Sequence, residues 1–79
     1  MIYVDAAIWK CGRMVMCHMI ADTPDELHRF ANELGLKRSW YQGDHYDICK
    51  RKRSIAVEHG AVALGRRDFV YKLRAYRTA

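Results

Sequence analysis

The sequence contains few of the residues and motifs that assign a small protein to a known chemistry. It has one proline, five glycines and three cysteines among its 79 residues. An odd cysteine count fits no self-contained disulfide framework, and the sequence has no paired C-x2-C spacing of a structural zinc site. It also lacks a P-loop, a nucleophile elbow, an H-E-x-x-H pair and a G-x-G-x-x-G loop. The strongest enzyme signatures are thus missing, and we expect neither a metal ion nor a cofactor.

Long apolar stretches are missing as well. No run approaches the roughly 18 residues that a membrane-spanning helix needs. The segment from Met1 to Asp5 also lacks the basic and then apolar composition of a signal peptide. We therefore expect a cytoplasmic protein with no membrane partner, in which Cys11, Cys17 and Cys49 are reduced thiols.

The length and hydrophobic content together predict one small folded domain. Hydrophobic residues make up 51% of the sequence, which argues against intrinsic disorder. A chain of 79 residues has room for a single domain over residues 1–79. A core of this size is only marginally stable by itself, so a homo-oligomer is one expectation.

Acidic residues are scarce in the last part of the sequence. Residues 1–49 contain five Lys or Arg and seven Asp or Glu, whereas residues 50–79 contain nine Lys or Arg against only Glu58 and Asp68. This asymmetry favours a surface that meets a polyanion, with nucleic acid or a nucleotide as the expected partner. The alternative is a solvated helix face that only maintains solubility. The basic residues are Lys50, Arg51, Lys52, Arg53, Arg66, Arg67, Lys72, Arg74 and Arg77.

Hydrophobic periodicity predicts an α/β fold with the element order ββαβαβα. The clearest signal is a helix start, where Thr23 suits the N-cap ahead of Pro24 and Glu26, and Gly35 suits the C-terminal end. Strands that alternate with helices are expected to be mostly parallel, in a sheet with helices in a two-layer or three-layer arrangement. The predicted strands span 2–4, 13–20, 39–42 and 61–64, and the predicted helices span about 24–34, 48–58 and 66–77.

A series of short motifs extends over nearly the whole chain. They are Ile2-Tyr3-Val4-Asp5, Cys17-His18, Asp22-Thr23, Glu26-Leu27-His28, Phe30-Ala31, Leu34-Gly35-Leu36, Trp40 with Gln42, His45-Tyr46-Asp47 and Gly60-Ala61-Val62. In these motifs the sequence resembles a small bacterial and phage family catalogued as a domain of unknown function, number 4031. The segment from His45 to Asp47 is the most distinctive part of the resemblance. It implies a bacterial or phage intracellular setting and no established reaction.

Two histidines and one aspartate are the candidate catalytic residues. In open α/β sheets, ligands bind beyond the carboxyl ends of the parallel strands. His18 lies near that end of its predicted strand, and His45 and Asp47 follow the next one, so we expect them to face one crevice. A neutral imidazole is a base near pH 7, and a carboxylate can orient it. Alternatively, His45 and Asp47 only make hydrogen bonds within their loop, with Asp47 as N-cap of the second helix.

The candidate ligand-binding residues surround this predicted crevice and continue into the basic segment. Two adjacent arginines at the start of the last helix could clamp a phosphate group, and helix N-termini offer further N–H donors. The predicted set is Gln42, Tyr46, Lys50, Arg51, Lys52, Arg53, Arg66 and Arg67.

Three functions are compatible with these features. The leading hypothesis is a module that binds a phosphate-bearing ligand, either nucleic acid or a nucleotide, through the basic C-terminal third. The second is a small hydrolase or nuclease in which His18 and His45 act as acid and base and Asp47 orients them, which requires the two histidines to share one face. The third is a protein-binding accessory factor or inhibitor of phage origin, which an exposed apolar patch around Trp9 or Trp40 would favour.

Overall fold

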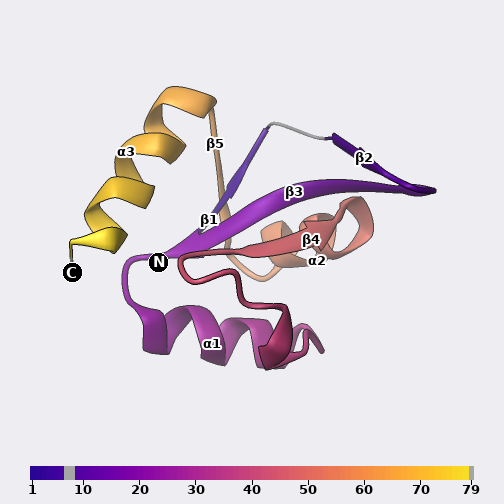
Figure 1. The fold of residues 1–79 in the computed structure, drawn as a ribbon, viewed down its shortest axis with the longest axis horizontal. Helices are drawn as coiled ribbons and strands as arrows, with labels where there is room; N and C mark the ends of the chain where they lie inside the picture. The colour runs from indigo at the N-terminus through magenta and orange to yellow at the C-terminus, as the bar shows by residue number, and fades with distance from the viewer. Residues whose placement is uncertain (7–8, 79) are drawn as a thin grey trace.

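The fold is built around one central strand of eight residues, β3 (Met14–Ala21). One edge of β3 pairs with β1 (Ile2–Asp5) and β2 (Trp9–Cys11), and the other edge pairs with β4 (Tyr46–Cys49). β5 (Val62–Leu64) pairs with the remaining edge of β1. The computed structural model describes residues 1–6 and 9–78, and Figure 1 shows the course of the chain.

The expected element order and the prediction of mostly parallel strands are both wrong. Among the described strands only β1 and β5 run parallel, and the three other pairings are antiparallel. The error lies in the segment 39–42, because Arg38–Trp40 forms a short 3-10 helix and the strand comes later, at β4. Aromatic residues favour strands, but the alternating burial of a strand belongs to Tyr46 and Ile48. The additional strand β2, which forms a hairpin with β3, is also missing from the predicted order.

Antiparallel pairing separates the helix N-termini that were expected to converge. α1 (Pro24–Glu33) follows the carboxyl end of β3, whereas α3 (Arg66–Arg77) follows the carboxyl end of β5. Because β3 runs opposite to β1 and β5, these two ends lie at opposite ends of the sheet. The carboxyl ends of β3 and β5 therefore do not share one edge of the sheet, as the prediction of parallel strands required.

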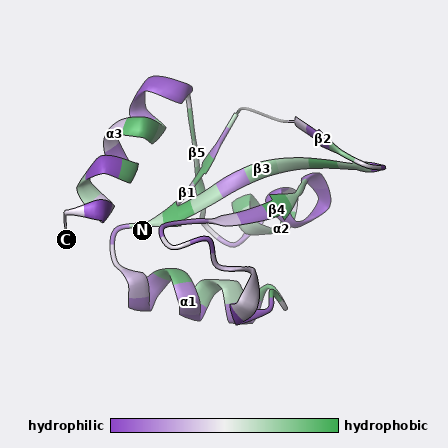
Figure 2. Ribbon diagram, in the orientation of Figure 1, coloured by the Kyte–Doolittle hydropathy of each residue, from purple (hydrophilic) through white to green (hydrophobic). Residues whose placement is uncertain are grey.

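Helices cover both faces of the sheet, so the architecture has three layers. α1 and α2 (Lys50–Glu58) pack on one face, and α3 packs on the other (Figure 1). The alternating side chains of β3 divide accordingly: Cys17 and Met19 belong to the core with α1, and Ile20 packs with Phe69 of α3. Figure 2 shows β1 and β3 as mostly hydrophobic, whereas α3 alternates between hydrophilic and hydrophobic residues. β3 therefore packs against a helix on each face, and His18 lies on the face that α3 covers.

The predicted helices are present with ends close to the expected ones. Thr23 caps α1 by accepting a hydrogen bond from the backbone N–H of Glu26 at 3.3 Å, and Gly35 has a φ of +79° just beyond the helix. α2 begins at Lys50 because the two preceding residues belong to β4. Across the described ranges, the structure contains no helix with the length and apolar character needed to cross a bilayer.

Cys17 is expected to resist alkylation in the folded protein. Its side chain is completely buried, and burial, together with the nearby charge of Asp5, raises the pKa of the thiol to about 12. Because the thiolate is the nucleophile, iodoacetamide at pH 8 should modify the exposed Cys11 and leave Cys17 free. Mass spectrometry of peptides from native and urea-unfolded protein measures both sites. Rapid modification of Cys17 in the native protein would contradict its place in the core.

Candidate functional site

A row of polar side chains crosses three adjacent strands on the face beneath α3. His18 of β3 stands directly opposite Asp47 of β4 in the strand register. On its other side, His18 contacts the carboxylate of Asp5 at the end of β1. Residues paired directly across a sheet place their side chains on the same face. Three residues that are far apart in the sequence are therefore brought together by the pairing of β3 with its two neighbours.

Asp5 fixes the position of the His18 ring. Its Oδ1 accepts a hydrogen bond from the His18 backbone N–H at 2.8 Å, and its Oδ2 lies 2.6 Å from Nδ1 of the ring. Asp5 is only 4% exposed. The rings of Trp9 and Phe69 flank the imidazole at centroid distances of 4.5 and 6.1 Å. Because an ionised carboxylate only accepts hydrogen bonds, Nδ1 of His18 is the donor to Asp5, and in the neutral ring Nε2 carries the lone pair.

His45 is held in a similar way by the carboxylate that precedes it. Its Nδ1 lies 2.5 Å from Oδ1 of Asp44, whose Oδ2 accepts a hydrogen bond from Nε of Arg77 at 2.6 Å. Burial alone would raise the pKa of Asp44, but the hydrogen bonds from His45 and Arg77 outweigh burial and hold that pKa below its usual value. Asp47 lies on the other side of the ring, with Oδ1 3.1 Å from Nε2. Asp44, and not Asp47, is therefore the carboxylate at Nδ1 of His45.

The two imidazoles meet at one cavity. Their ring centroids are 5.1 Å apart in an edge-to-face arrangement, and both rings line a cavity of about 480 Å³. Phe69 packs with the buried residues of the sheet, which anchors α3. Arg66 and Arg77 on the same helix consequently border the cavity. The volume is in the range of small-molecule sites, and the cavity combines two basic nitrogens with two guanidinium groups.

His18, His45 and Asp47 also form a set of potential metal ligands. One side-chain nitrogen or oxygen from each residue lies within 4.8 Å of the others. Two imidazoles and one carboxylate are ligands that zinc and other divalent transition metals use in proteins. The arrangement can therefore move protons directly or hold an ion that does so.

A comparison with known protein families identifies the family of the chain. The family model described as protein of unknown function (DUF4031) matches residues 2–76. The chain belongs to this family. The resemblance noted in the sequence is thus confirmed, and the DUF4031 match contains every residue that lines the cavity except Arg77. Neither the curated proteins nor the solved structures contain a significant match to the chain.

Of the eight predicted ligand-binding residues of this DUF4031 chain, Arg66 lines the cavity and the other seven do not. Tyr46 is buried in the core, where its hydroxyl lies 2.7 Å from Nδ1 of His28. Gln42 lines a different cavity of about 440 Å³, which Asp47 also borders. The alternative in which Asp47 caps the second helix is wrong, because Cys49 occupies the N-cap position of α2 and makes no side-chain capping bond.

The basic residues of α2 divide between structural and exposed positions. Lys52 donates a hydrogen bond from Nζ to the carbonyl oxygen of Leu34 at 2.6 Å, close to the end of α1. Arg53 donates from Nε to the carbonyl oxygen of Asp5 at 3.1 Å. Lys50 and Arg51 are exposed. Half of this basic segment therefore tethers α2 to its neighbours.

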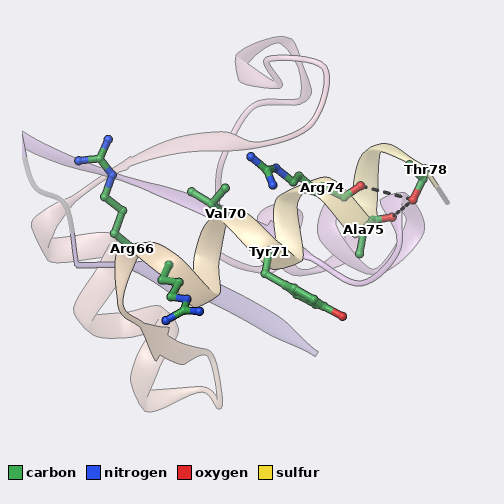
Figure 3. Close-up of a pocket in the computed structure, with 7 residues that line it drawn as sticks. Arg66, Val70, Tyr71, Arg74, Ala75 and Thr78 are labelled. Atoms are coloured by element: carbon green, nitrogen blue, oxygen red, sulfur yellow. Dashed lines mark hydrogen bonds between the residues drawn. The ribbon is translucent and has the colours of Figure 1, made fainter.

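The basic residues of α3 line an exposed surface. Arg66 and Arg67 border an open hollow of about 950 Å³ that continues along the helix to Arg74 and Tyr71 (Figure 3). The Tyr71 side chain is 68% exposed. Arg66 and Val70 border both this hollow and the histidine cavity, so the two regions are neighbours along α3.

Asp5, Asp44 and Arg77 are site residues that sequence reasoning missed. Asp5 ends an apolar, strand-forming run, and an acidic residue at the end of a buried strand is a usable signal. Asp44 directly precedes His45, which suggests a carboxylate–imidazole pair. Arg77 has no such local signal, because its contact with Asp44 depends on how α3 docks on the sheet.

Proposed function

We propose that the protein hydrolyses a phosphate ester of a nucleic acid or nucleotide in the cavity beside His18 and His45. The observation that carries this proposal is that His18 and His45 line one cavity with Arg66 and Arg77. Asp47 lies beside the two rings, close enough to form a cluster of potential ligands with them. The hydrolase hypothesis required both histidines to share one face of the sheet, and they do.

The two arginines supply the binding half of this function. A guanidinium group carries five N–H donors and can pair with two phosphate oxygens at once. Asp44 engages only Nε of Arg77, so the terminal nitrogens of that residue remain available to a phosphate. Arg66 adds a second cation on the same wall. Positive groups in this position stabilise the negative charge that builds up on phosphoryl oxygens during transfer.

The two imidazoles and Asp47 supply the chemical half. The oxygen of a water molecule adds to phosphorus, and its proton passes to a base at the cluster. The P–O bond to the leaving group breaks, and the leaving oxygen takes up a proton. Because their Nδ1 atoms face carboxylates, His18 and His45 present Nε2 for these transfers, either directly or through a bound ion.

Binding without cleavage is a second candidate function, which the surface of α3 favours. Arg66, Arg67 and Arg74 line the open hollow together with Tyr71, whose exposed ring extends from the same helix in Figure 3. Arginines beside an exposed aromatic ring are typical of surfaces that bind single-stranded nucleic acid, since the ring can stack on a base.

Labelled single-stranded DNA and RNA distinguish these functions in one experiment that follows binding by anisotropy and cleavage by gel. We expect cleavage in the wild type and a loss of at least about 100-fold in His45→Ala, the range for removal of a general acid or base. His59→Ala, which removes an exposed histidine at the end of α2, is the matched control and should leave the rate unchanged.

The α3 surface is tested with the same probes. Arg67→Ala with Arg74→Ala should weaken binding and flatten its salt dependence, because fewer phosphates are neutralised. Binding without any cleavage would support the second function and overturn the first. Absence of both binding and cleavage at low salt would contradict the two together.

A further inference from the structure

The hydrogen bonds of the two histidines leave the same ring atom free on each. Asp5 occupies Nδ1 of His18 at 2.6 Å, and Asp44 occupies Nδ1 of His45 at 2.5 Å. A carboxylate that accepts from one imidazole nitrogen raises the basicity of the other and fixes the ring orientation, as it does for most histidines that bind metals. Asp5 does this for His18, and Asp44 does it for His45. Neither aspartate belongs to the set of potential metal ligands.

The third member of the cluster has a polar atom without a partner. Oδ1 of Asp47 is buried and accepts no hydrogen bond from any residue that the structure describes. It lies 3.1 Å from Nε2 of His45, and neither atom of this pair is a donor when Nδ1 carries the ring proton. Two acceptors that face each other at this distance are unfavourable by themselves and become favourable when a cation lies between them.

We propose that Nε2 of His18, Nε2 of His45 and Oδ1 of Asp47 together bind one divalent transition-metal ion, with Zn²⁺ as the best match. One potential ligand atom from each of the three residues lies within 4.8 Å of those of the others. Ligand atoms at about 2.0–2.1 Å from zinc in a tetrahedron are about 3.4 Å apart, so a pair of these atoms must approach by at most about 1.4 Å on binding. Two imidazoles disfavour Mg²⁺ and Ca²⁺, which prefer oxygen ligands.

Three protein ligands leave one coordination position of a zinc ion open. Both histidines border the cavity with Arg66 and Arg77, so that position is accessible to water or to a phosphate oxygen. A catalytic zinc ion lowers the pKa of its bound water to about 7. The catalytic use of the ion rests on the proposed function, whereas ion binding itself requires no substrate.

Isothermal titration of metal-free wild-type protein with ZnCl₂ tests the inference. We expect one Zn²⁺ per chain, and at least about 100-fold weaker binding in His45→Ala and in Asp47→Asn, which keeps the shape of the side chain. Asp44→Asn leaves all three ligands in place and should weaken binding by about 10–100-fold. His59→Ala and Cys11→Ser are the controls and should bind as the wild type does. Circular dichroism verifies that each variant is folded.

A second measurement uses Trp9, whose ring lies 4.5 Å from that of His18. In Trp40→Phe it is the remaining tryptophan, and Co²⁺ should quench its fluorescence with the same stoichiometry as zinc binding. Binding that survives His45→Ala and disappears in Cys11→Ser would overturn the inference, as would no binding at all. Hydrolysis by metal-free protein would overturn the catalytic use of the ion and leave the proposed function intact. Zinc binding without hydrolysis would support ion binding and overturn the proposed function.

Discussion

Tyr46→Ala is expected to leave the protein largely unfolded at 25 °C. Tyr46 is the largest completely buried side chain and is 1% exposed. Truncating a buried aromatic residue to alanine costs about 3–5 kcal/mol, and the core of so small a domain rarely supplies more than that amount in total. The loss should be larger than in most substitutions because the side chain lies on β4, which closes one edge of the central strand. Urea unfolding followed by far-ultraviolet circular dichroism measures the free energy of unfolding.

Two matched variants separate packing from the hydroxyl group of Tyr46. Tyr46→Phe keeps the ring and removes the bond to His28, at a cost of about 1 kcal/mol. Tyr71→Ala removes an equally large ring from an exposed position on α3 and should change stability by less than about 0.5 kcal/mol. A folded Tyr46→Ala protein with stability close to that of the wild type would show that Tyr46 is not a core residue. It would then return Tyr46 to the set of ligand-binding candidates.

Asp5→Asn is expected to produce a folded protein that has lost most of the proposed hydrolytic activity. The amide oxygen can still accept the His18 backbone N–H, so the fold should persist with a loss of about 1–2 kcal/mol. The amide nitrogen is a donor, however, and it requires Nδ1 of His18 to become the acceptor. The ring proton then moves to Nε2 and blocks the atom that faces the cavity. We expect hydrolysis to fall by at least about 100-fold.

The tautomer of His18 is the readout that separates positioning from general destabilisation. Nitrogen-15 spectra should show the Nδ1–H form in the wild type and the Nε2–H form in Asp5→Asn. Asp22→Asn is a suitable control, since Asp22 is an exposed acidic residue whose carboxylate accepts a hydrogen bond from Tyr3. Full activity of Asp5→Asn together with a changed tautomer would rule out Nε2 of His18 as a participant.

The parts of the fold that the sequence predicts well are those with local causes. α1 is such a part, because Thr23, Pro24 and Gly35 act within a few residues of the helix ends. β3 is another, since its alternating apolar residues meet a helix on each face. The direction of the strands was not predictable in this way. The direction depends on which segment after α1 joins the sheet. The aromatic residues Trp40 and Tyr41 favoured a strand in a segment where the chain instead forms a short 3-10 helix.

The candidate site was predictable in its residue types and not in its geometry. His18, His45 and Asp47 do lie together, but the cause is the register of β3 with β4 and not the convergence of parallel strand ends. The carboxylates that contact Nδ1 of His18 and His45 could not be predicted for the same reason. Asp5 is thirteen residues from its partner, and only the pairing of β1 with β3 reveals the contact.

The contacts of His18 with Asp5 and Asp47 form only when β3 pairs with both neighbouring strands in the correct register. In a strand, a slip of one residue turns every side chain to the opposite face. If β3 were shifted by one position, Cys17 or Met19 would stand between the two aspartates, and the imidazole would enter the hydrophobic layer under α1. A chain with this shift would therefore lack the contacts of His18 with Asp5 and Asp47 on which the proposed site depends.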